Sequence, residues 1–372
     1  MKIVHAALHT VRLPLVHEFQ TSSHAKRHLD HILVELTDES GAVGWGEIAS
    51  ASHPFYGPET VETATLVAER YLLPSLIGAE WFHPAQASRL WAKVRGNEFA
   101  KAGVDMACWV LFAEVGGLPL AKVLGGTREQ AATGVSLGIE PTIDALVAQV
   151  AAQIEAGYRR VKLKIAPGWD VEPVAAVRAT FGDHDLHVDA NGAYPADDAS
   201  FEIMRALDQY HLTMIEQPFA PRNFVDHARL QAQLDTPVCL DEAVETLDDL
   251  QTMIELKAGR VLNIKVSRMG GLTTAIAAHD RAGEAGIPVW CGGMHEFGIG
   301  RAANVALTSL PGFSLPSDVS GSAKYYARDV ITPPVETTAD GYVPIPTQPG
   351  LGFSVDTAWI AENSLATIQI EE

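Results

Sequence analysis

The sequence predicts a (β/α)8-type barrel, a modified TIM barrel, together with an α+β capping domain built from the N-terminus and the C-terminal tail. From residue 131 onward, short β-branched runs alternate with amphipathic helical stretches. Before residue 125, a pattern typical of antiparallel strands gives way to helical periodicity. We therefore expect a capping domain over residues 1–125, a barrel over 126–325, and a C-terminal segment over 326–372 that returns to the capping domain.

The expected capping domain begins with a hairpin. The stretch "HILVELTDESGAVGWGEIA", residues 31–49, predicts two strands joined at residues 38–41, where polar residues and a glycine suit a hairpin loop. Helical periodicity follows over residues 58–78 and again over 100–117, where two glycines end the second helix. A sheet followed by helices is typical of an α+β domain.

Eight strand segments, each followed by a helical stretch, are expected in the barrel domain. They cover residues 133–139, 160–166, 186–191, 213–218, 237–243, 260–267, 287–293 and, with a weaker pattern, 305–314. The number and order of these units are those of a (β/α)8 barrel. A doubly wound sheet is the alternative, but no Gly-x-Gly-x-x-Gly turn follows a strand.

Composition restricts the function classes. Asp and Glu number 46 against 27 Lys and Arg, and the net charge of −19 argues against nucleic acid and anionic membrane surfaces as partners. Three widely spaced cysteines in apolar surroundings, Cys108, Cys239 and Cys291, fit a reducing compartment. The opening residues lack the apolar core of a signal peptide, and no apolar run approaches the roughly 18 residues of a membrane span. We expect a soluble, cytoplasmic protein.

Ionisable residues recur at the ends of the predicted barrel strands. They are Lys162, Lys164, Asp189, Glu216, Asp241 and Lys265, and from Lys162 the strand-to-strand gaps are 27, 27, 25 and 24 residues. In a parallel barrel all of these positions reach the C-terminal mouth. Helix capping explains a single acidic residue and a solvated strand face explains a lysine pair, but neither explains the whole set.

The three carboxylates predict a metal site. Carboxylates gathered at one mouth repel each other unless a cation lies among them, and all-oxygen ligation suits Mg²⁺ or Mn²⁺. No Cys or His accompanies them at the spacing of a zinc site. A divalent ion there can bind a small-molecule carboxylate and stabilise the dianion formed when the adjacent α-proton is removed.

The lysines supply the base. Lysine is ordinarily protonated at neutral pH, and Lys162 is expected to favour the neutral amine of Lys164 by like-charge repulsion, aided by desolvation. Lys265 lies four strands around the ring and is expected to face Lys164 across the substrate. Two opposed lysines allow proton removal on one face and donation on the other, or removal by one while the other stabilises the anion.

With these residues the sequence resembles the enolase superfamily, and within it the muconate-cycloisomerase subgroup, specifically the o-succinylbenzoate synthase and N-acylamino acid (N-succinylamino acid) racemase family. The resemblance covers essentially the whole chain. It is carried by "GVSLGI" (134–139), "GYRRVKLKIAPGWD" (157–170), "VDAN" (188–191), "IEQP" (215–218), "CLDEA" (239–243), "NIKVSRMGG" (263–271), "CGGM" (291–294) and "GIGRA" (298–302).

The resemblance implies a role for each member of the set. Mg²⁺ is expected at Asp189, Glu216 and Asp241. Lys164 is the implied general base, Lys265 is its counterpart on the other face, and Lys162 helps to hold the carboxylate. The candidate substrate-binding residues are Asn191 near the metal, Phe19, Ser23, Phe55 and Tyr56 in the capping domain, and Ser136, Gly293, Met294, His295 and Glu296 in the barrel. Ordinary interdomain packing is the alternative for the aromatic residues. We also expect a homo-oligomer.

Some positions depart from the pattern of the relatives. His295 and Phe297 flank Glu296 where many relatives carry Leu or Ile before it and Thr or Ser after it, so we expect the pocket wall to differ in shape and polarity from theirs. A lone histidine is more often a structural hydrogen bonder than a ligand group. Ala303 and Val110 also differ from the residues that relatives often carry, and these differences indicate changes in packing.

The resemblance leaves several activities open. Syn-dehydration to o-succinylbenzoate in menaquinone biosynthesis and racemisation of N-succinylamino acids use the same lysines and metal, and we favour a bifunctional enzyme. A muconate-type cycloisomerase is an alternative, as is a dipeptide epimerase. Epimerases usually carry an Asp-x-Asp pair at the eighth strand, where this chain offers only Asp318. A non-catalytic metal-stabilised binding protein is the distant alternative.

Overall fold

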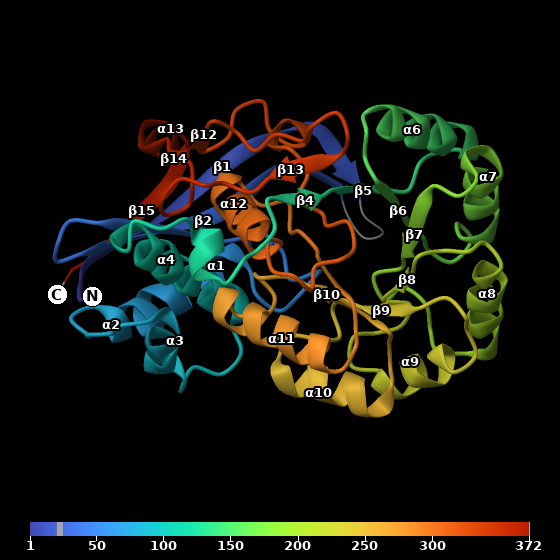
Figure 1. Cartoon of the computed structure of the whole chain (residues 1–372), viewed down its shortest axis with the longest axis horizontal. Helices are drawn as coiled ribbons and strands as arrows, with labels where there is room; N and C mark the ends of the chain where they lie inside the picture. Colours follow the sequence, from blue (N-terminus) through green and yellow to red (C-terminus); the bar gives the residue numbers. More distant parts are fainter. Residues whose placement is uncertain (21–24, 372) are drawn as a thin grey trace.

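The first and last strands of the chain lie side by side in one antiparallel sheet, so the two termini are neighbours (Figure 1). The structure is a computed structural model that describes the backbone of residues 1–20 and 25–371 and the side chains of residues 1–17 and 27–371. The strand order is β15-β1-β2-β3. The strands are β1 (Ile3–Gln20), β2 (Ala25–Asp38), β3 (Val43–Ile48) and β15 (Ser364–Glu371). The predicted hairpin is β2–β3.

Helices cover one face of this capping sheet. They are α1 (Val61–Val67), the π-helical segment Ala68–Leu72, α2 (Leu73–Leu76), α3 (Pro84–Ala87), the 3-10 segment Ser88–Trp91, α4 (Glu98–Val115) and α5 (Leu120–Val123). Glycines let α4 pack closely on β3, because a Cβ atom at Gly46 would lie 1.9 Å from the carbonyl oxygen of Gly103. The single helix expected over 58–78 is interrupted by the π turn, next to Pro74, which cannot donate a backbone hydrogen bond.

Seven parallel strands form the barrel wall in sequence order, and the predicted fold class is confirmed (Figure 1). The strands are β5 (Gly134–Leu137), β6 (Arg160–Lys164), β7 (Asp185–Asp189), β8 (Ile215–Glu216), β9 (Val238–Leu240), β10 (Val261–Ile264) and β11 (Val289–Cys291). The helices are α6 (Ile143–Glu155), α7 (Val171–Phe181), α8 (Asp198–Asp208), α9 (Phe224–Gln231), α10 (Leu247–Leu256), α11 (Leu272–Glu284) and α12 (Gly298–Leu307). A continuous buried apolar cluster fills the space between strands and helices.

The eighth unit differs from the sequence prediction. Residues 305–307, expected to begin a strand, complete α12. Isolated parallel bridges instead join Phe313 to Val289 and Ser317 to Thr133, and so link the two ends of the seven-stranded sheet. A short apolar run reads equally as a buried helix or a buried strand, and Pro311 and Gly312 interrupt any longer strand.

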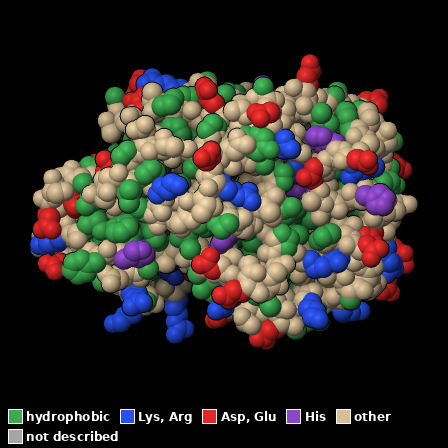
Figure 2. All heavy atoms as spheres, in the orientation of Figure 1, with side chains coloured by type: hydrophobic (Ala, Val, Ile, Leu, Met, Phe, Trp, Pro, Cys, Tyr) green, Lys and Arg blue, Asp and Glu red, His purple; other side chains and the backbone are tan. Residues whose placement is uncertain are grey.

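The C-terminal segment packs against both parts of the chain. Its elements are a 3-10 turn (Ser322–Lys324), β12 (Ile331–Thr332), β13 (Tyr342–Pro344), β14 (Ser354–Val355) and α13 (Thr357–Asn363), and β13 pairs with β4 (Gln130–Ala132). No helix in residues 1–20 and 25–371 is long and apolar enough to cross a membrane. On the face seen in Figure 2, acidic and basic side chains are interspersed.

Two buried carboxylates hold the capping domain on the barrel mouth. Glu47 of β3 accepts hydrogen bonds from the backbone N–H groups of Phe297 and Gly300, both at 2.7 Å, at the start of α12. Asp105 of α4 accepts from the backbone N–H of Thr273 at 3.0 Å, at the start of α11. Within the described residues, neither helix has a side-chain cap of its own, so the capping domain satisfies their free N–H groups.

Candidate active site

The strand register brings the predicted charged residues together at the barrel mouth. Lys164 is the neighbour of Asp189 across β6 and β7, and Asp189 is the neighbour of Glu216 across β7 and β8. Asp241 directly follows β9, and Lys265 directly follows β10. Parallel strands end at the same face of the barrel, which explains why residues about 25 positions apart in sequence meet there.

Each of the three carboxylates is paired with a lysine. The Nζ of Lys164 lies 2.5 Å from Asp189, and the Nζ of Lys265 lies 2.8 Å from Asp241. The Nζ of Lys162 lies 3.2 Å from Glu216 and 3.5 Å from Asp189. The charge of Lys162 is therefore balanced by carboxylates, and Lys162 and Lys164 belong to one ionic network.

The electrostatics of the network show that the carboxylates are close enough to repel one another. Burial raises the pKa of Glu216 to about 8, and the charges of Asp189 and Asp241 add to the rise. Burial acts in the same direction on Asp189, but Lys164 and Lys162 outweigh it and hold its pKa below the usual range. The pKa of Lys162 is raised, because Asp318, Glu216 and Asp189 outweigh the effect of its burial.

Several partners in the network were not predicted from the sequence. Asn263 donates to Glu216 at 2.7 Å, and the Arg268 guanidinium contacts Asp241. Asp318 lies 3.1 Å from Lys162 and 2.9 Å from Arg160. Arg268 lies three residues after Lys265, in the turn that follows β10 and within a motif already singled out. Asp318 had no local signal, since it lies more than 150 residues from its partners.

Asn191 lies beside the predicted base. Its Oδ1 accepts from Lys164 at 2.6 Å, and its Nδ2 donates to Glu242 at 2.8 Å. The residue has a φ of 45°, a left-handed conformation that asparagine tolerates better than most residues. Asn191 is therefore placed to orient the Lys164 amine.

The donor set is suited to a divalent cation. The Glu216 pKa shows that the three carboxylates repel, and oxygen-only ligation is what Mg²⁺ prefers. In the described residues, the ammonium groups of the lysines and the Arg268 guanidinium lie against these oxygens, and no group of three or more His, Cys, Asp or Glu side chains is arranged as a metal site. The three carboxylates are chemically suited to bind Mg²⁺, and their role as ligands stays a prediction.

The capping domain contributes one side chain directly to this network. The Nζ of Lys265 donates to the hydroxyl of Tyr56 at 3.0 Å and lies 4.9 Å from the centre of its ring. Phe55 is 62% exposed, so it does not pack as an ordinary interdomain residue in this structure. The candidates Phe19, as a side chain, and Ser23, entirely, lie outside the described residues.

The remaining candidates line the mouth or brace its loops. Ser136 donates to Asp318 at 3.0 Å. The loop after β11 is held by Glu296, which accepts from the backbone N–H of Met294 at 2.9 Å and from Asn304 at 3.0 Å. Gly293 is tightly enclosed, because a Cβ there would lie 3.2 Å from the Glu296 carboxylate.

His295 contributes to this loop through its conformation and stacking. It has a φ of 62°, and its ring stacks on Tyr325 at 4.9 Å. Tyr326 donates to its carbonyl oxygen at 2.5 Å. These contacts fix the shape of the loop that carries Met294.

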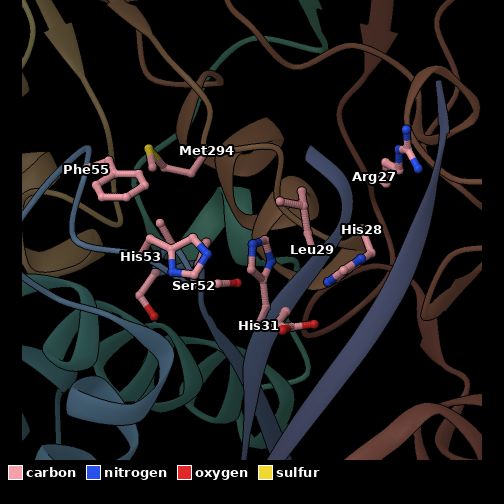
Figure 3. A pocket seen from close by; sticks show the side chains of 12 residues that line it. Arg27, His28, Leu29, His31, Ser52, His53, Phe55 and Met294 are labelled. Carbon is pink, nitrogen blue, oxygen red and sulfur yellow. The ribbon is translucent and has the colours of Figure 1, made fainter. Parts of the chain in front are cut away.

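Two cavities flank the network. The first, about 350 Å³, lies between the capping domain and the barrel, and Figure 3 shows Met294 opposite Phe55 with His31 and His53 beside them. We call it the histidine cavity. The second, about 730 Å³, is lined by Ser136, the loop after β5, Lys324 and Tyr325, and we call it the Lys324 cavity.

Comparisons with known proteins identify the family. Residues 145–359 match the model described as "Enolase C-terminal domain-like", and residues 3–125 match "Mandelate racemase / muconate lactonizing enzyme, N-terminal domain". An o-succinylbenzoate synthase from Geobacillus kaustophilus is 44% identical over 96% of this chain and 94% of its own. An N-succinylamino acid racemase from Amycolatopsis sp. is 42% identical over 100% of both chains.

A solved structure agrees with these relatives. The enolase-superfamily protein from Listeria innocua has a TM-score of 0.96 and 38% identity, over 100% of this chain and 99% of its own. The sequence relatives are enzymes and align along nearly their whole length. The chain is therefore an enzyme that belongs to the enolase superfamily.

Proposed function

We propose that this enzyme removes the proton α to a carboxylate and acts as an o-succinylbenzoate synthase, an N-succinylamino acid racemase, or both. One observation carries the proposal: Lys164 and Lys265 reach the same carboxylate cluster from different strands, each held by its own aspartate. A single base would require only one such lysine. Two lysines suit chemistry that handles a proton on either face of one carbon.

Each residue of the site has its own proposed role in the reaction. Lys164, as the neutral amine, takes the α-proton on one face, while Asn191 and Asp189 orient its Nζ. Lys265 returns a proton on the opposite face, or stabilises the developing negative charge when no proton is returned. Lys162 stays charged, because its pKa is raised, and is placed to attract the substrate carboxylate. Tyr56 positions Lys265.

We propose Mg²⁺, with Mn²⁺ as the alternative, as the cofactor, held by Asp189, Glu216 and Asp241. A bound divalent cation supplies positive charge that stabilises the anion left when the proton departs. The mutual repulsion of the three carboxylates supports this assignment, as does the reliance of the superfamily on Mg²⁺.

Dehydration and racemisation both begin with this proton removal. In dehydration, loss of the neighbouring hydroxyl together with the α-proton releases water and leaves a double bond. In racemisation, the proton returns from the other side. Relatives of each name are over 40% identical to this chain, so we propose a bifunctional enzyme, with dehydration serving menaquinone biosynthesis.

A dipeptide epimerase is disfavoured by the ion pairs of one residue, Asp318. Asp318, the residue available for a substrate ammonium, is already shared by Lys162 at 3.1 Å and Arg160 at 2.9 Å. Its negative charge is neutralised inside the protein. A muconate-type cycloisomerase is the second candidate, and assay of a cis,cis-muconate substrate distinguishes it.

The experiment measures α-proton exchange. Purified enzyme with Mg²⁺ in D₂O is expected to exchange the α-proton of N-succinyl amino acids and to racemise them, and to dehydrate the o-succinylbenzoate precursor. Chelation of the metal is expected to stop all three. Lys164→Ala is expected to abolish racemisation and exchange on the face that Lys164 serves. Unchanged exchange from both enantiomers in that variant would exclude Lys164 as a base.

We also propose a cytoplasmic, homo-oligomeric enzyme that acts on a small-molecule carboxylate. The three cysteines are buried and unpaired, as expected in a reducing compartment. The oligomer rests on the family resemblance, and light scattering after size exclusion measures it.

A further inference from the structure

The Lys324 cavity opens beside the strand that carries the proposed base. Ser136, which lines the cavity, is the neighbour of Lys162 across β5 and β6. The hydroxyl of Ser136 donates to Asp318, which lies 3.1 Å from Lys162. The cavity is therefore connected to the ionic network of the mouth through two residues.

Lys324 enters this cavity from the C-terminal segment, where the described side chains give it no acidic partner. Its Nζ donates to the backbone oxygen of Ser136 at a long 3.4 Å, and it lies over the rings of Tyr325 and Tyr158. No Asp or Glu in the part of the chain that the structure describes forms an ion pair with it. Glu140 lines the same cavity but does not come within ion-pairing distance.

The surroundings of Lys324 are rich in positive charge. Asp318, the acidic residue that acts on it, is already paired with Arg160 and Lys162. Arg301 also lies over the Tyr325 ring, 4.9 Å from its centre. The pKa of Lys324 is lowered to about 7, chiefly by burial; Asp318 acts in the opposite direction, and the charges of Arg301, Arg160 and Lys162 act in the same direction as burial. Among the described groups that act most strongly on Lys324, three cations outnumber one carboxylate, and this setting suits a bound anion.

We propose that Lys324 binds the distal carboxylate of the substrate's succinyl group in the Lys324 cavity. The inference rests on the proposed function but not on the choice between its two activities, because the substrates that both relatives' names imply carry a succinyl group. The α-carboxylate lies at the ionic network and the succinyl chain extends past Ser136. The histidine cavity is then left for the variable side chain.

The proposed charge-assisted hydrogen bond between Lys324 and the distal carboxylate contributes to the binding affinity. Its loss is expected to weaken binding by about tenfold to a hundredfold. The matched probes are N-succinylglycine and its terminal amide, which differ only in the charge of the distal group. The matched control for Lys324→Gln is Lys93→Gln, an exposed lysine of the capping domain.

Calorimetry with Mg²⁺ present measures affinity without turnover. The wild type and Lys93→Gln are expected to bind N-succinylglycine at least tenfold more tightly than the amide, and Lys324→Gln to bind both within about threefold. Lys324→Arg is expected to keep most of the preference, because it keeps the positive charge.

The outcomes separate the two proposals. A wild type that binds acid and amide equally overturns the role of Lys324, even if Lys324→Gln does not fold. A full preference retained by folded Lys324→Gln overturns it as well. Absence of α-proton exchange in the wild type, alongside a preference that Lys324→Gln removes, overturns the proposed reaction and leaves the carboxylate site standing.

Discussion

The two lysines of the site sit in different settings. Lys164 is held by Asp189 and Asn191, both from the barrel, and its side chain is 13% exposed. Lys265 is held by Asp241 and by Tyr56 of the capping domain, and its side chain is 8% exposed. The partners of Lys164 all come from the barrel, whereas Lys265 also has a partner from the capping domain. Substitutions in the capping domain should therefore affect the two faces unequally.

The largest expected effect follows removal of either lysine. Lys164→Ala and Lys265→Ala are each expected to lower the rate of racemisation by about a hundredfold to ten-thousandfold, which is the usual contribution of a positioned base or acid. Polarimetry measures the rate, with Lys93→Ala as the control. Racemisation within tenfold of the wild type in either variant would contradict the two-base assignment.

Substitution of Glu216 is expected to weaken cation binding, and with it proton transfer on both faces of the substrate. Glu216→Gln keeps the shape of the side chain, but it replaces one carboxylate oxygen beside Asp189 and Asp241 with an amide nitrogen that cannot bind a cation. We expect Mn²⁺ affinity and activity to fall by about a hundredfold, by analogy with the 10–100-fold losses at supporting positions of metal sites. Titration calorimetry with Mn²⁺ provides the readout, and unchanged affinity would remove Glu216 from the proposed ligands.

A smaller effect is expected from Tyr56→Phe, and only on one face. The substitution removes the oxygen that accepts from Lys265 but keeps the ring beside it. Exchange on the Lys265 face is expected to slow by about threefold to tenfold, while exchange on the Lys164 face is kept. Tyr71→Phe, at an exposed tyrosine, is the control. Equal slowing on both faces would show that Tyr56 does not act through Lys265.

The stability of the protein is expected to depend on pH through Asp105, which lies where the capping domain contacts the barrel. It is buried at the start of α11, the helix that follows the Lys265 strand, and burial raises its pKa to about 7. A raised carboxyl pKa means that the folded protein binds the proton more tightly than the unfolded chain. Asp105 therefore stabilises the fold at low pH, and the stabilisation is lost as pH rises from about 4 to 7.

Asp105→Asn should remove that pH dependence. The wild type is expected to lose up to about 4 kcal/mol of its unfolding free energy between pH 4 and 7 relative to the variant. Urea unfolding across that range measures the difference. Parallel pH profiles for the two proteins would show that Asp105 is ionised in the folded state at acidic pH.

The barrel and its charged residues could be predicted because both depend on sequence spacing. The repeated strand–helix spacing places Asp189, Glu216 and Asp241 at the C-terminal face of the barrel, independently of the loop conformations. Their partners Asp318 and Lys324 come from the far end of the chain, and only folding brings them near Lys162. Residues 305–307 were assigned to a strand, because an apolar run does not distinguish a buried helix from a buried strand. The contacts of Glu47 and Asp105 across the domains likewise have no local signal.

Stereospecific exchange is the most direct test of the two-lysine account. Each enantiomer of an N-succinyl amino acid is incubated in D₂O with the wild type, Lys164→Ala or Lys265→Ala, and NMR follows the α-proton. The account predicts that the wild type exchanges both enantiomers and that each variant exchanges one, a different one in each case. If both variants lose exchange of the same enantiomer and keep the other, the two lysines do not act on opposite faces, and the central claim is wrong.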